Sequence, residues 1–248
     1  MDTYFDLGEY SFPVTTQSTE AQTWFDRGIL WTYGYNHEEA VTCFERAIDA
    51  DPKCAMAHWG AGYASGPNYN MPWDLFDDAG RAAAARAGYA HARKALDLID
   101  GATEWEAALI QALPARHPQP DPLDPEAMTA WNANWADAML DVFAAHPESH
   151  EVRTVFAESL LNLTPWKMWD LRSGKPAASA RTVEAQTVLE EALEGDPSAM
   201  RHPGLLHLYV HLMEMSPFPE KALKAGDALR RLVPDAGHLI HMPTHIDI

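Results

Sequence analysis

Two histidines and a glutamate are spaced as metal ligands on one helix would be. In the segment GLLHLYVHLME, His207 and His211 stand four residues apart and Glu214 follows three residues later. On a helix, this i, i+4, i+7 spacing places all three side chains on one face. A His-x3-His pair lets two imidazoles bind one ion from a single helix, so the spacing predicts a transition-metal site.

A second group of histidines lies near the end of the sequence, at His238, His241 and His245. We expect it to meet the first group, because neighbouring helices pack about 8–10 Å apart. Imidazoles with one carboxylate suit a divalent transition metal (Zn²⁺, Fe²⁺, Mn²⁺, Ni²⁺ or Cu²⁺) better than Ca²⁺ or Mg²⁺. Six candidates exceed what one ion needs, so some could be supporting residues or general bases, or the site could hold two ions. The preferred ligands are His207, His211, His241 and His245, with Glu214 as a fourth ligand or an orienting carboxylate.

The scaffold that positions these residues is predicted to be helical. Ala-rich amphipathic segments recur from about residue 19 to residue 231, and no convincing run of alternating β-branched residues appears. Numbering a 34-residue tetratricopeptide (TPR) repeat from Ala21 matches nearly every consensus position. The matches are Trp24, Gly28, Trp31, Ala40, Phe44, Ala47 and Pro52, and Arg27 replaces the usual Leu.

The sequence therefore predicts one all-α domain over residues 1–248, a right-handed superhelix of TPR-like hairpins, or α-solenoid. Clear units cover 21–54 and 203–236, degenerate units cover 55–200, and an incomplete unit covers 237–248. In the middle we expect helices at 77–98, 104–116, 124–145, 150–163 and 182–194.

The repeat numbering places both histidine groups on the concave groove of the superhelix. Pro243 leaves an alternative open, because proline disfavours helix at the residue before it. In that alternative the last helix begins only near Pro243, and His238 and His241 lie on the loop that approaches it.

Several segments together resemble a family of bacterial TPR proteins. They are GYNHEEA (34–40), MAHWG (56–60), GPNYN (66–70), AESL (157–160), PW (165–166), HLYVH (207–211) with Glu214, and GHLIHMPTHI (237–246). The resemblance covers nearly the whole chain and implies further site residues at His37, Asn68, Asn70, Glu158 and Trp166. It also implies further repeats beyond residue 248. Because the last repeat unit is incomplete, we expect either such repeats or self-association to cover the last helix.

Each added residue also has a purely structural interpretation. His37 would follow a helix cap at the surface, Asn68 and Asn70 would serve a turn, and Trp166 would be a packing residue. Glu158 lies in an apolar helix, where a carboxylate is usually paired or functional, and it is a candidate general base. We expect the histidines outside these groups to lie at the surface and the two cysteines to be buried thiols. These are His91, His117, His146 and His150, and Cys43 and Cys54.

Composition narrows the function classes. Lys and Arg number 18 against 36 Asp and Glu, a net charge of −18, which disfavours nucleic-acid binding and electrostatic docking to membranes. The sequence has no run of about 18 apolar residues and no recognisable signal peptide, so we expect a cytoplasmic protein. The leading hypothesis is a metal-dependent enzyme acting on a small molecule or peptide in the groove. The alternative is a non-catalytic TPR scaffold that binds a partner protein or peptide there.

Overall fold

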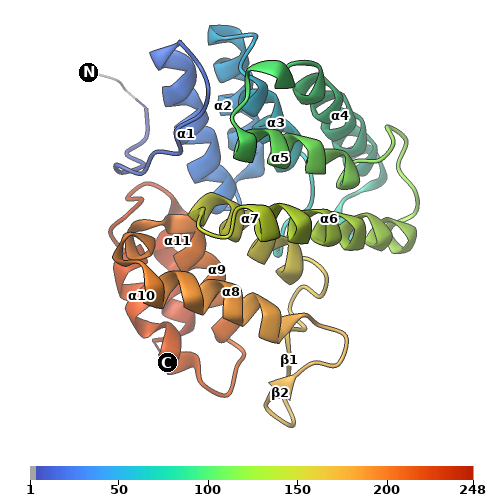
Figure 1. The fold of residues 1–248 in the computed structure, drawn as a ribbon. Coiled ribbons are helices and arrows are strands. Elements are labelled where there is room, and N and C mark those ends of the chain that lie inside the picture. The colour runs from blue at the N-terminus through green and yellow to red at the C-terminus, as the bar shows by residue number, and fades with distance from the viewer. Residues whose placement is uncertain (1–3, 248) are drawn as a thin grey trace.

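The computed structural model describes residues 4–247, and α-helices dominate it (Figure 1). The all-α prediction is confirmed. The α-helices are α1 (Thr19–Tyr33), α2 (His37–Ala50), α3 (Ala55–Ala64), α4 (Asp78–Asp97), α5 (Glu104–Ala112), α6 (Pro125–Ala145), α7 (His150–Leu161), α8 (Thr182–Gly195), α9 (Pro203–Met213), α10 (Leu223–Leu229) and α11 (Gly237–His241). Short 3-10 helices are η1 (Trp73–Leu75), η2 (Ile99–Gly101), η3 (Leu113–Ala115), η4 (Pro197–Arg201), η5 (Pro219–Ala222) and η6 (Met242–His245), and the strands are β1 (Trp169–Asp170) and β2 (Lys175–Pro176).

Side-chain caps explain where several helices begin. Asn36 accepts a hydrogen bond from the backbone N–H of Glu39 at the start of α2, as its position before an acidic first turn predicts. Thr103 and Glu106 form a reciprocal capping box at the start of α5. The helices expected in the middle of the chain are all present, with ends within a few residues of the predicted ones.

The first three helices pack around Phe44. An added methyl group at Gly28 of α1 would lie 2.7 Å from the Phe44 ring, and one at Gly60 of α3 would lie 2.4 Å from it. The two glycines therefore let α1 and α3 approach the Phe44 ring of α2 closely. Cys43 and Cys54 are free thiols buried beside this packing, as predicted.

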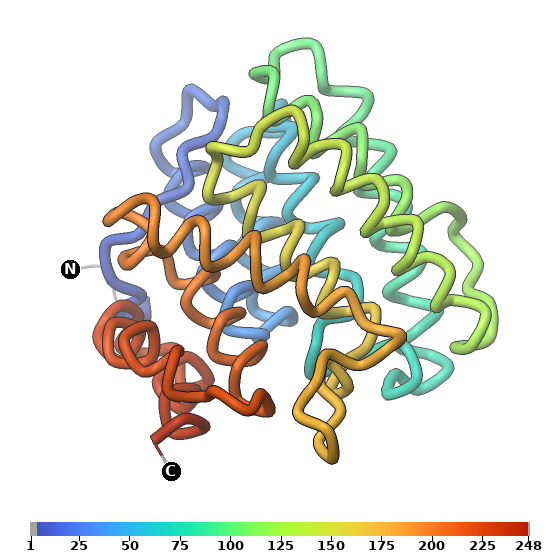
Figure 2. The backbone as a smooth tube through the Cα atoms, turned by 60° about the horizontal axis from the view of Figure 1, so that its bottom comes forward, coloured from blue at the N-terminus to red at the C-terminus, as the bar shows by residue number. Residues whose placement is uncertain are grey.

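The two ends of the described chain meet. Helix α9 packs against α1 and α7, and the backbone N–H of Asp235 donates to the carbonyl of Asp6 over 2.9 Å. In Figures 1 and 2 the C-terminal helices, in red, lie beside the N-terminal segment, in blue. In an open repeat array each unit contacts only its neighbours. The additional contact matters here because it joins the end of α1 to the histidines of α9.

Three local expectations differ from the structure. The connector after α7 contains a small antiparallel hairpin of β1 and β2. The alternative raised by Pro243 is wrong, because α11 forms before this proline and is followed directly by η6, which contains it. The expectation of a surface His117 is also wrong: its ring is fully buried against Gly88, where an added methyl would lie 2.3 Å away. Within residues 4–247, no helix is long and apolar enough to cross a membrane.

Candidate metal centre

Three separate elements bring the centre together: the turn after α1, helix α9 and helix α11. His207 and His211 lie one turn apart on α9, and each is only 1% exposed. His238 comes from the first turn of α11 and is half-buried. Helix α9 starts at Pro203 and is capped by the preceding His202, whose Nδ1 accepts from the N–H of Leu205 over 3.2 Å.

The imidazoles of His207, His211 and His238 converge on one point and could hold a metal ion. One ring nitrogen from each residue lies within 4.8 Å of the others. Nε2 of His207 is 3.0 Å from Nε2 of His238, and Nε2 of His211 is buried with no hydrogen-bond partner among the described residues. Nitrogens that share one Zn²⁺ at about 2.0–2.1 Å are about 3.3 Å apart in tetrahedral geometry, so no two of these nitrogens would have to approach each other by more than about 1.5 Å to hold one ion.

Hydrogen bonds fix the orientation of two of these rings. Nδ1 of His211 is 3.1 Å from Oε1 of Glu214, and His207 donates to the backbone carbonyl of Tyr33. Metal-binding histidines usually donate their second ring nitrogen to a carboxylate or a carbonyl in this way. Glu214 therefore sits where it orients His211, and Nε2 of that ring is left free.

The electrostatics of the cluster favour neutral imidazoles. Burial lowers the pKa of His238 to about 4, and the neighbouring His211 adds to this effect. The pKa of His207 falls well below its ordinary value, first through burial and then through His211. Burial opposes ionisation of Glu214, but His211 and His245 outweigh it and lower the pKa of the carboxyl. Neutral rings beside an ionised carboxylate are the protonation states that a metal cation binds.

Tyr35 packs directly against the three histidines, and sequence reasoning did not single it out. Its ring centroid lies 4.5 Å from that of His207, 5.3 Å from His238 and 5.6 Å from His211. Tyr35 adopts a positive φ of 56° in the turn between α1 and α2, a left-handed backbone conformation that is uncommon for residues other than glycine. A tyrosine between Gly34 and Asn36, where a turn is expected, was the available signal.

His241 and His245 lie beside this group rather than within it. Nδ1 of His245 is hydrogen-bonded to Oε2 of Glu214, and Nε2 of His245 is 2.9 Å from Nε2 of His241. His241 is exposed and His245 is half-buried. The six predicted residues are therefore neighbours, but the structure divides the imidazoles into two sets. The buried His207 and His211 with the half-buried His238 form one (the buried set), and His241 and His245 form an outer pair.

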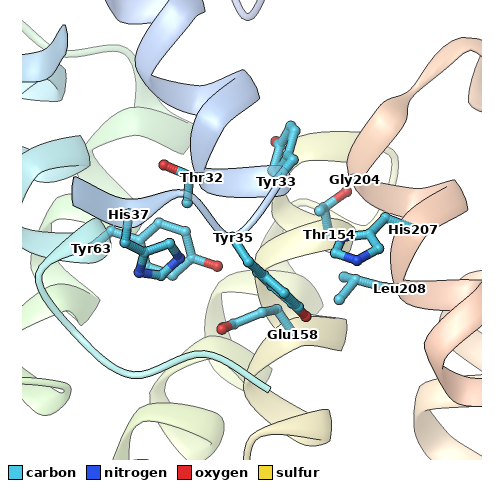
Figure 3. Close-up of a pocket in the computed structure, with 10 residues that line it drawn as sticks. All are labelled: Thr32, Tyr33, Tyr35, His37, Tyr63, Thr154, Glu158, Gly204, His207 and Leu208. Carbon is cyan, nitrogen blue, oxygen red and sulfur yellow. The ribbon is translucent and has the colours of Figure 1, made fainter. Parts of the chain in front are cut away.

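Glu158 lies near the centre without contacting its histidines. It is 5% exposed and lines a small cavity together with Tyr35 and His207 (Figure 3). Burial raises the pKa of its carboxyl, although Arg116, 3.9 Å away, opposes this shift. Oε2 of Glu158 and the hydroxyl of Tyr35 are buried without hydrogen-bond partners in the described chain. The cavity has room for about one water molecule, which these two groups could bind.

The residues added by resemblance occupy different environments. His37 is half-buried and lines the same cavity, with Nδ1 3.3 Å from the carbonyl of Gly66, and burial lowers its pKa to about 4. Asn68 is buried, and its side chain accepts from the N–H groups of Asn70 and Met71, as its structural interpretation predicts. Asn70 is half-buried in the same turn.

Trp166 lies on a large groove that passes beside the centre. It is 44% exposed and lines a groove of about 1080 Å³ with Trp73 of η1 and Asn162 at the end of α7. Its ring centroid is also 6.3 Å from that of His211. The buried Asn162 amide donates to Oε1 of Glu158, so it connects the groove to the cavity beside His207.

Comparison with known proteins returns no family model, no curated protein and no solved structure that matches this chain. The resemblance to bacterial TPR proteins and the open superhelix therefore stay predictions.

Proposed function

We propose that this protein is a metalloprotein that binds one divalent transition-metal ion through His207, His211 and His238. The observation that carries the proposal is the convergence of three imidazole nitrogens, one of them buried and unpartnered. A buried polar atom without a partner costs about 1–3 kcal/mol, and a bound ion would remove that cost at His211. Glu214 and the Tyr33 carbonyl hold two of the rings in the orientation that binding needs.

We propose further that the ion is catalytic. Three imidazoles leave a coordination position for water or substrate, and a bound water of lowered pKa is a nucleophile near neutral pH. Glu158 is the candidate general base, because burial raises its pKa and the residue lines the same cavity as His207. Its Oε2 has an ion pair with Arg116 over 3.9 Å but no hydrogen-bond partner in the described chain. The substrate would be a small molecule or peptide bound in the groove lined by Trp73 and Trp166.

The TPR-like superhelix belongs to the same proposal. The Trp24, Gly28, Phe44 and Pro52 pattern and the packing of Phe44 between two glycines support a repeat origin for α1 to α3. In this view the repeats form the scaffold, and the contact between α1 and α9 brings Tyr35 onto the centre.

Tight binding of one metal ion is the first expected result. Protein purified without a histidine tag should retain about one equivalent of Zn²⁺, Fe²⁺, Mn²⁺, Ni²⁺ or Cu²⁺ after dialysis, measured by elemental analysis. We expect His211→Ala to lower the affinity at least 100-fold, because it removes one of three ligands, and His207→Ala to act in the same way. Thermal unfolding with and without the ion gives a second readout, since a ligand at 100 times its Kd stabilises the folded state by about 2.7 kcal/mol.

His91→Gln is the matched control for these variants. His91 is a half-buried histidine on α4, and its described contacts do not include the centre. The His91→Gln variant should therefore bind the ion as tightly as the unchanged protein does. If the purified protein contains no metal and added Zn²⁺ does not change its thermal stability, the proposal is contradicted and the non-catalytic scaffold is favoured.

A further inference from the structure

The outer pair, His241 and His245, has its own ligand geometry. His245 lies four residues after His241, at the end of η6, and the two rings contact each other. Their Nε2 atoms are 2.9 Å apart and their ring centroids 4.8 Å apart. Nitrogens that share one Zn²⁺ at about 2.0–2.1 Å are about 3.3 Å apart in tetrahedral geometry, so small rotations would admit an ion.

Glu214 orients this pair as it orients the buried set. Its two oxygens bond different rings: Oε1 contacts Nδ1 of His211, and Oε2 contacts Nδ1 of His245. In both rings the bond to Nδ1 leaves Nε2 for a ligand. The Glu214 side chain is only 6% exposed, so solvent screens its negative charge weakly on either side.

We propose that His241 and His245 form a second metal site, which shares Glu214 with the first. Water would complete the coordination sphere, since His241 is exposed. Two imidazoles and water suit Zn²⁺, Cu²⁺ or Ni²⁺, and the smaller ligand set makes this site weaker than the buried one. The second site uses no ligand atom of the first, so it does not require that the proposed function be correct.

Another histidine pair in the chain lacks these features. His58 and His91 also approach each other, with Nδ1 atoms 3.2 Å apart. These nitrogens are the ones next to the side-chain stem, and no described hydrogen bond joins either ring to a carboxylate. Lys94 lies near enough to lower the pKa of His58, after burial as the larger cause, and its charge would repel a metal cation. This pair is therefore a matched internal control.

Zn²⁺ stoichiometry tests the second site. The untagged, metal-stripped protein should take up two Zn²⁺ ions in equilibrium dialysis, one tight and one at least tenfold weaker. His241→Ala should remove only the weaker ion, His211→Ala should remove the tight one, and His91→Gln should keep both. Glu214→Gln should weaken both ions by about 10–100-fold, because it orients a ring in each site. Because His241 is exposed, its replacement should leave the circular dichroism spectrum unchanged.

The possible failures are distinguishable. Uptake of one ion, lost in His211→Ala and kept in His241→Ala, would overturn the second site and leave the first. A weaker ion that survives in His241→Ala but is lost in His91→Gln would assign it to the other pair and would also overturn the proposal. If one ion is lost equally in His211→Ala and His241→Ala, all the imidazoles serve a single site and the second site is wrong. If the protein binds no tight ion but does bind a weaker one, which only His241→Ala removes, the proposed function is wrong and this inference holds.

Discussion

Replacing Phe44 with alanine is expected to destabilise the protein by about 3–5 kcal/mol, the usual cost of emptying a buried aromatic site. Phe44 is fully buried, and its ring lies against Gly28 of α1 and Gly60 of α3. It also packs on Phe25, with ring centroids 5.3 Å apart. Removing the ring would leave a cavity shared by three helices. Urea unfolding followed by circular dichroism measures the loss.

The same contact can be tested from the opposite side by adding volume. In Gly60→Ala, the new methyl group would lie 2.4 Å from the ring, so Phe44 or a helix backbone must move. Overpacking of this kind costs about 1–3 kcal/mol. Gly101→Ala is the control, because nothing lies within 4 Å of the added methyl there.

The double variant decides whether the two effects share one cause. With Phe44→Leu in place, the clash at Gly60→Ala is reduced, so the combined loss should be smaller than the sum of the two single losses. Strict additivity would show that the ring does not hold α2 against α3 as described. This packing matters for the site, because Tyr35, which lies in the turn between α1 and α2, packs against the histidines.

Sequence predicted those parts of the fold that are determined by residues close together in the chain. Ser18, Asn36 and Asp77 cap α1, α2 and α4 with their own side chains, so the helix starts are visible in the sequence. Gly28, which contacts the Phe44 ring, also follows the repeat spacing, whereas Gly60 does not, because the residue 34 positions after Gly28 is Gly62. The contact between α1 and α9 has no local signal, because it joins segments far apart in the sequence.

In the candidate site too, sequence predicted the local arrangement but not the contacts between distant segments. His207, His211 and Glu214 could be placed on one face from their spacing alone, and the structure places them so. The separation of His238 from His241 depends on how α11 is set against α9 and on where it tightens into η6. Sequence spacing gave no means of choosing His238 over His241 as the partner of the buried pair.

Other residues near the site were hidden because only tertiary packing defines them. Arg116 follows a Pro-containing stretch that reads as a helix end, yet its guanidinium is buried beside Glu158 and over the Tyr63 ring. The burial of His117 was hidden in the same way, because its ring occupies the space left by the missing side chain at Gly88. A histidine beside a proline gives no sign of such a partner from a distant helix.

We expect the buried histidines outside the centre to make the protein less stable in acid. Burial lowers the pKa of His117 to about 3, with the Arg116 charge adding to it, and burial lowers the pKa of His202 to about 3 as well. An unfolded histidine has a pKa of about 6.5. Between these values the unfolded chain binds protons that the folded chain does not, so stability is full above about pH 6.5 and falls as the pH drops. From pH 7 to pH 5 the two residues together should cost about 4 kcal/mol.

Urea unfolding at pH 7, 6 and 5, with a chelator present, measures this dependence. The chelator is needed because protons and metal ions compete for the ligand histidines. His117→Gln can keep a donor towards the Gly62 carbonyl, and His202→Asn can keep the cap of α9, so both variants should fold. Each should lose about 2 kcal/mol of the pH dependence that the unchanged protein shows. Neither residue is a proposed ligand. An undiminished acid dependence in both variants would contradict this prediction and would assign the proton uptake to other buried imidazoles, such as His37 or those of the metal centre.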